Sequence, residues 1–176
     1  EQAVEKFLAA QENDALMLGE IMIFDNHAYA QIVEQSTGIG AMEVLVDPVT
    51  LAVTPEHGPN MMWNLKYGMM AGYGGGMMGM MMGGGSGMMN NAPVQPEEIT
   101  ADLPVSPEEA VESAQRYLDT YLPGTQVEDH ADPFYGYYTL HVLRDGEVIG
   151  MLSVNGYTRQ VFLHTWHGDF IEMRGE

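Results

Sequence analysis

The sequence has no cysteine among its 176 residues. Disulfides, thiolate nucleophiles and thiolate metal sites are therefore excluded. Basic residues are also scarce, because 6 Lys and Arg stand against 25 Asp and Glu and give a formal net charge of −19. A surface of this sign repels phosphate groups, so nucleic acid and anionic membranes are poor partners, whereas cations and basic proteins are favoured.

The signatures of common enzyme classes are missing as well. The chain contains no G-x-S-x-G elbow, no P-loop and no dinucleotide fingerprint. The glycine-rich stretch at residues 72–79 has neither the Lys-Ser/Thr pair nor the preceding strand of a phosphate-binding loop. Carboxylate pairs are numerous, but an acidic chain has many by chance. We therefore predict that the protein is not an enzyme.

The two ends of the chain resemble each other. Shifting the sequence by 108 positions places residues 30–55 on residues 138–163 without a gap. Each copy shows an alternating strand, a turn with Gly, a second alternating strand, a turn that ends in Thr, and a third strand. The identical pairs are Gly38 with Gly146, Val46 with Val154, Thr50 with Thr158, and Val53 with Val161.

An amphipathic helix is expected before each set of strands. The second helix has Ser106 as N-cap and Pro107 at its first position, and Pro123-Gly124 ends it. Its apolar stripe consists of Ala110, Val111, Ala114, Tyr117, Leu118 and Tyr121. The first helix begins at the start of the chain, and its stripe is Val4, Phe7, Leu8 and, if the helix extends that far, Leu16.

These patterns predict an α+β fold made of two similar small units. In each unit a helix packs on an antiparallel sheet of three to four strands, because alternation gives the sheet one apolar face that a helix can cover. We assign residues 1–58 to the first unit, residues 59–96 to a Met/Gly-rich insert and residues 97–176 to the second unit.

The repeated unit resembles the PepSY domain, a family named for peptidase propeptides and a spore-germination protein. The matching segments are VLVDPVTLAV (44–53) and SPEEAVESA (106–114), with a looser match in SVNGYTRQVF (153–162). The second copy has Asn155 in place of the family's Asp, and Leu51 and Arg159 stand where the family usually has Gly. The resemblance implies an exported, non-catalytic module that acts by binding or inhibition.

The insert is the most unusual part of the chain. Eleven of the 16 methionines lie between Met61 and Met89, ten glycines lie between Gly68 and Gly87, and no charged residue occurs from Tyr67 to Met89. A flexible linker would be expected to use Ser, Thr and charges rather than large apolar side chains. A membrane span is disfavoured because glycine clusters weaken a helix. A hydrophobic docking or self-assembly surface remains an alternative, since methionine adapts to many partners.

Thioether sulfur is a soft, neutral ligand that suits Cu(I) and Ag(I). We therefore predict a soft-metal site, with copper as Cu(I), in the insert. Histidines near the end of each repeat add harder ligands. Two residues three apart in a strand point to opposite faces, so His164 and His167 chelate together only if the strand ends between them. His27, His130 and His141 are expected at the surface. The predicted ligands are Met61, Met62, Met69, Met70, Met77, Met78, Met80, Met81, Met82, Met88, Met89, His57, His164 and His167.

The sequence thus predicts an exported tandem PepSY-like protein that binds copper or silver and stores, buffers or transfers it. The predicted location is extracytoplasmic: periplasmic, cell-surface or secreted. No signal peptide is visible, so the numbering would describe a mature chain. The expected partner is a soft metal ion, together with the chain itself or another exported protein. The alternative is a structural or interaction module whose insert supports assembly into an oligomer or fibre.

Overall fold

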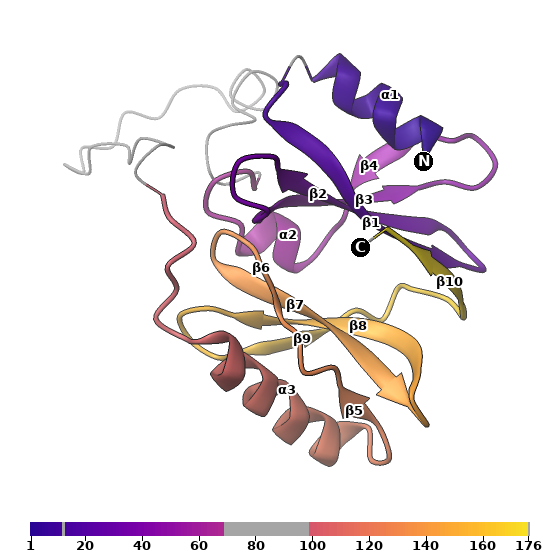
Figure 1. The fold of residues 1–176 in the computed structure, drawn as a ribbon. Coiled ribbons are helices and arrows are strands. Elements are labelled where there is room, and N and C mark those ends of the chain that lie inside the picture. Colours follow the sequence, from indigo (N-terminus) through magenta and orange to yellow (C-terminus); the bar gives the residue numbers. More distant parts are fainter. Residues whose placement is uncertain (12, 69–98, 176) are drawn as a thin grey trace, which may run out of the picture.

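The computed structural model describes residues 1–11, 13–68 and 99–175. Two five-stranded antiparallel sheets lie face to face, and a helix covers the outer side of each (Figure 1). The predicted α+β fold of helix-on-sheet units is confirmed. The elements are α1 (Gln2–Ala10), β1 (Leu16–Phe24), β2 (Ala28–Glu34), β3 (Gly40–Val46), β4 (Val53–Pro55), α2 (Pro59–Met62), α3 (Pro107–Tyr121), β5 (Gln126–Val127), β6 (Asp132–Pro133), β7 (Tyr137–Arg144), β8 (Glu147–Asn155), β9 (Val161–Leu163) and β10 (Phe170–Arg174).

The two sheets have related strand orders. The first runs β10-β1-β2-β3-β4, and the second runs β5-β7-β8-β9 with β6 paired to β7. Each sheet therefore holds a four-stranded meander that follows a helix. The first sheet has β10 added beside β1, whereas in the second sheet β5 and β6 both pair with β7. The closing strand pairs agree in register as well, because Val46 faces Val53 in the first half and Val154 faces Val161 in the second, 108 positions later in both cases.

The turns that close the two meanders have the same hydrogen bonds. The Asp47 carboxylate accepts the backbone N–H groups two and three residues later, at 3.0 and 2.7 Å, and the Asn155 side-chain oxygen accepts the equivalent pair at 3.0 and 3.0 Å. A short polar side chain that bonds to the backbone just ahead of it is the basis of an Asx turn. The replacement of Asp by Asn in the second copy therefore preserves the geometry of the turn.

Helix α3 packs on the second sheet and forms the core of the second half with it. Its N-terminus has the predicted cap at Ser106. The Glu109 N–H donates to the Ser106 hydroxyl at 3.3 Å, and the Glu109 carboxylate accepts the Ser106 N–H at 3.1 Å, which completes a capping box. The buried apolar residues of this core are Val105, Ala110, Ala114, Leu118, Ala131, Tyr138, Leu140, Val142, Leu152 and Val154.

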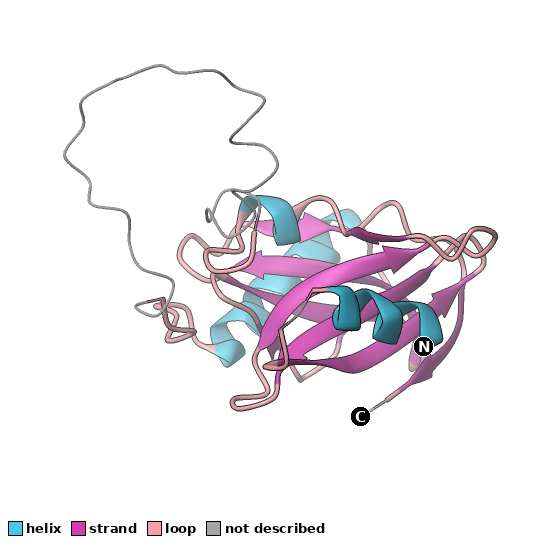
Figure 2. Cartoon of the chain, turned by 90° about the horizontal axis from the view of Figure 1, so that it is seen from above, coloured by secondary structure: helices cyan, strands magenta, loops and turns pink. Residues whose placement is uncertain are grey.

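Helix α1 covers the first sheet, as Figure 2 shows from above, but it is shorter than the longest version predicted. It ends at Ala10, and Leu16 begins β1 instead of extending the helical stripe. The reason is local, because the Asn13 side chain accepts the Ala15 N–H at 3.1 Å and forms a turn that competes with helix. The buried apolar residues of this core are Val4, Leu16, Ile21, Ala30, Ile32, Ala41, Val44 and Val46.

The inner faces of the two sheets bury one another. At one end this layer is apolar, with Met22, Phe24 and Tyr29 of the first sheet packed on Met151 of the second. Elsewhere the layer is polar and includes the fully buried Glu43 and Glu56. After β9 the chain crosses back to the first sheet, where β10 pairs with β1. No helix in the described part of the chain is both long and apolar enough to cross a membrane.

Candidate metal centre

Glu56 is placed by the end of β4 and the turn into α2. Its N–H donates to the Glu43 carbonyl at 2.8 Å, and its own carbonyl accepts the Asn60 side-chain amide at 3.0 Å. Gly58 follows with φ of 88°, and a Cβ at that position would lie 2.8 Å from the Trp166 ring. Only glycine combines this backbone conformation with so close an approach. These contacts hold the backbone at Glu56, and the Trp166 indole N–H donates to its Oε1 at 2.9 Å.

The crossover between β9 and β10 supplies the two histidines. Strand β9 ends at Leu163, before both histidines and not between them as the prediction required, so His164 and His167 both lie outside the strand and need not point to opposite faces. The His164 N–H still donates to the Met151 carbonyl at 3.0 Å, and the Asn26 amide donates to the Trp166 carbonyl at 2.9 Å. These bonds fix the crossover against both sheets.

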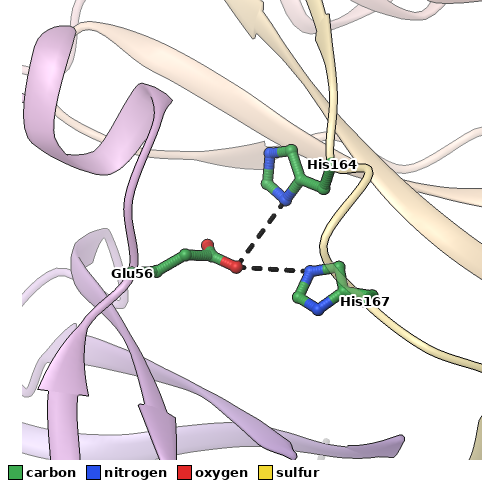
Figure 3. Close-up of side chains that lie close together, drawn as sticks. All are labelled: Glu56, His164 and His167. Carbon is green, nitrogen blue, oxygen red and sulfur yellow. Dashed lines mark ion pairs between the residues drawn. The ribbon is translucent and has the colours of Figure 1, made fainter. Parts of the chain in front are cut away.

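The side chains of Glu56, His164 and His167 converge from the two halves of the chain (Figure 3). Glu56 Oε1 lies 3.2 Å from His167 Nε2 and 3.9 Å from His164 Nδ1. The donor atoms of all three residues lie within 4.8 Å of one another. A carboxylate oxygen and two imidazole nitrogens at 2.0–2.2 Å from a tetrahedral ion are roughly 3.3–3.6 Å apart, so small side-chain shifts would suit one ion.

Burial keeps these groups neutral in the absence of a cation. It raises the pKa of Glu56 to about 8, an effect that the Trp166 hydrogen bond opposes. It also lowers the pKa of His167 to about 4, with His57 adding to the effect, and it holds the pKa of His164 well below its usual value. The short contacts in Figure 3 are therefore not ion pairs at neutral pH, despite their distances.

Three buried polar atoms of this group have no hydrogen-bond partner: Glu56 Oε2, His164 Nδ1 and His167 Nε2. Such atoms cost free energy, on the order of 1–3 kcal/mol each, unless a ligand satisfies them. By contrast, the other ring nitrogens are occupied, because His164 Nε2 lies 2.9 Å from the Ser153 hydroxyl and His167 Nδ1 lies 2.7 Å from His27 Nε2. In protein metal sites, each histidine usually binds the ion through one ring nitrogen, while its other ring nitrogen is hydrogen-bonded to a partner that orients the ring.

The structure groups some of the predicted ligands and not others. His164 and His167 meet, whereas His57 contacts Trp166, with ring centroids 4.1 Å apart and the rings tilted by 49°, and is not in the group. Met61 and Met62 lie in α2, and Met62 is exposed. The other predicted ligands, Met69, Met70, Met77, Met78, Met80, Met81, Met82, Met88 and Met89, lie outside the described residues.

For three residues of interest, the prediction from the sequence was incomplete or wrong. Glu56 was not predicted as a ligand, and its position beside His57 after a strand is the only signal that marks it. The expectation of a surface position is wrong for His141, which is 5% exposed and lies between Glu20 and Glu128. His27 is half-buried and contacts His167, while His130 is exposed as predicted.

Comparisons with models of protein families, with curated proteins and with solved structures give no match to this chain. What the protein does has to be inferred from the geometry of the site.

Proposed function

We propose that the protein is an exported, non-catalytic metal-binding protein, and that Glu56, His164 and His167 hold a transition-metal ion between its two halves. The observation that supports this most strongly is the convergence of two buried imidazole nitrogens without hydrogen-bond partners, His164 Nδ1 and His167 Nε2, on the buried carboxyl of Glu56. A metal ion would satisfy both nitrogens and would offset the cost of burying the Glu56 carboxylate. The two imidazoles favour zinc, copper or nickel over magnesium or calcium.

Copper is the ion we propose for the protein in its natural setting. Cu(II) binds nitrogen and oxygen donors more tightly than other first-row divalent ions do. Cu(I) prefers the thioethers of the insert, and this part of the proposal rests on the sequence alone. Storage, buffering or transfer of copper outside the cytoplasm would fit both sets of ligands. The repeated helix-and-meander unit supports a PepSY-like relationship, which stays part of the proposal.

The proposed site is tested most cleanly with Zn(II), because thioethers bind zinc poorly. We expect calorimetry on the whole protein to give one zinc ion per chain. Glu56→Gln removes the charge without changing the shape, and His167→Ala removes a donor, so each should lower the affinity at least tenfold. His130→Ala is the matched control, since this exposed histidine lies outside the group. Equal zinc affinity in Glu56→Gln and the natural protein would rule out the site.

A further inference from the structure

A chain of buried hydroxyl groups leads from the proposed metal site to Glu43. The Ser153 hydroxyl lies 2.9 Å from His164 Nε2 and 3.2 Å from the Thr139 hydroxyl. The Thr139 hydroxyl in turn lies 3.0 Å from Glu43 Oε1. All four side chains are buried, so water does not compete for these hydrogen bonds.

Strand pairing explains how the chain of hydroxyls forms. Thr139 on β7 and Ser153 on β8 are directly opposite each other, and both point toward the first sheet rather than toward α3. Glu43 reaches them from β3 of that sheet, and His164 follows the end of β9. Neighbouring residues on one face of an antiparallel pair lie close enough to bond, so the backbone holds the two hydroxyls in line.

The number of hydrogens that each group carries determines which group donates in each of these hydrogen bonds. Glu43 Oε1 accepts the hydroxyls of Tyr29 and Thr139, at 2.9 and 3.0 Å, whereas Oε2 accepts one hydroxyl, that of Tyr137. Oε2 therefore keeps a lone pair that can carry an acid proton, and the bond from Thr139 then stays unchanged. Because a hydroxyl has a single hydrogen, Thr139, having donated to Glu43, can only accept from Ser153.

The same reasoning then gives the position of the hydrogen on His164, the proposed metal ligand. Ser153 donates its hydrogen to Thr139, so it can only accept from His164. His164 must carry its hydrogen on Nε2, which leaves Nδ1 as a lone pair. This is the atom without a partner that faces Glu56 at 3.9 Å.

We propose that Thr139 and Ser153 are positioning residues, which hold His164 in the Nε2–H tautomer and so present its Nδ1 lone pair to the metal ion. Thr139 does not touch His164, so its effect passes through Ser153. The tautomer is a property of the metal-free protein, whereas its consequence for affinity rests on the function proposed above. In metal sites, loss of such a supporting partner typically costs 10–100-fold in affinity.

The test measures the tautomer of His164 by nitrogen NMR on metal-free protein labelled with 15N-histidine, together with zinc affinity. We expect the natural protein to show the Nε2–H form. Thr139→Val keeps the shape of the side chain but removes the hydroxyl, which frees Ser153 to donate to Nε2. His164 should then shift toward the Nδ1–H form, and zinc affinity should fall about tenfold. Thr139→Ser keeps a hydroxyl and should restore both properties.

Ser153→Ala provides a second measurement, because it removes the direct partner of Nε2 without adding bulk. We expect a mixture of tautomers in this variant. An unchanged Nε2–H tautomer in Thr139→Val and Ser153→Ala would overturn the proposal. If the tautomer shifts as stated but the natural protein binds no zinc, the positioning role stands and the proposed metal function fails.

Discussion

Leu51 and Arg159 occupy equivalent positions in the two halves, 108 residues apart, and both have a left-handed backbone, with φ of 58° and 62°. A side chain with a Cβ costs roughly 1–2 kcal/mol in this conformation. The two turns are therefore held by their hydrogen bonds and their surroundings against an unfavourable backbone geometry.

Leu51→Gly should stabilise the protein. Relief of the left-handed strain outweighs the added flexibility of glycine in the unfolded chain, so we expect a gain of about 0.5–1 kcal/mol in the free energy of unfolding, measured with denaturant. Val49→Gly is the control, because Val49 is also exposed in this turn but has no positive φ. It should destabilise the protein. A Leu51→Gly variant less stable than the natural protein would contradict the argument.

The buried Glu34 depends on the cation of Lys66. Lys66 Nζ lies 2.7 Å from Glu34 Oε1, and the hydroxyls of Tyr67 and Tyr135 donate to the same carboxylate at 2.5 and 2.7 Å. Although burial works in the opposite direction, these contacts lower the pKa of Glu34 to about 2. Lys66→Met leaves the charge unpaired and should cost about 2–3 kcal/mol of stability.

A double-mutant cycle measures this coupling. Glu34→Gln combined with Lys66→Met should cost less than the sum of the two single changes, because each single change leaves one partner unsatisfied. The pH dependence gives a second measurement. The folded pKa of Glu34 is below its unfolded value, so its contribution is present above about pH 4.5 and is lost as the pH falls toward 2. Additive costs in the cycle would exclude the coupling.

His141 should make stability depend on pH in the opposite direction. Burial lowers its pKa, but the carboxylates of Glu20 and Glu128, at 3.2 and 2.6 Å, outweigh burial and raise the pKa to about 9. Asp132 also lies near this group. The folded pKa exceeds the unfolded one, so the contribution is complete below about pH 6.5 and disappears as the pH rises through 9.

The measurement compares unfolding free energies of the natural protein and His141→Gln from pH 6 to pH 9.5. Their difference should shrink by about 1–3 kcal/mol over this range, since one pKa unit corresponds to 1.36 kcal/mol and Glu128 is partly exposed to solvent. His130→Gln is the control, because His130 is exposed. A difference that stays constant with pH would show that His141 is not charged in the folded protein.

A test of the copper prediction for the insert has to distinguish Cu(I) binding by methionine sulfur from docking through an apolar surface. Replacing the eleven methionines at residues 61–89 by leucine retains apolarity and removes the soft ligand. Titration against a Cu(I) chelator should show loss of Cu(I) binding, whereas zinc binding between the sheets should persist. If the variant keeps its Cu(I) affinity, the insert is not the soft-metal site, and continued self-association in sedimentation experiments would favour a docking surface.

Local features of the fold were predictable because local forces determine them. The capping box at Ser106 and the turns at Asp47 and Asn155 depend on residues within a few positions of one another, so their sequence patterns carry the full physical cause. Period-two alternation likewise predicted that a helix would cover one face of each sheet. The end of α1 was less predictable, because the turn at Asn13 competes with an apolar pattern that continues to Leu16.

The sequence by itself determined two similar helix-and-sheet units, the absence of thiol chemistry, and a pair of histidines beyond the last strand of the repeat. Tertiary structure decided that the inner faces of the two sheets would bury each other, and that the crossover to β10 would bring His164 and His167 to Glu56. These contacts join residues more than a hundred positions apart. They depend on how the inner surfaces of the two sheets fit together. The periodic pattern along the chain shows only which residues lie on the same face of a sheet.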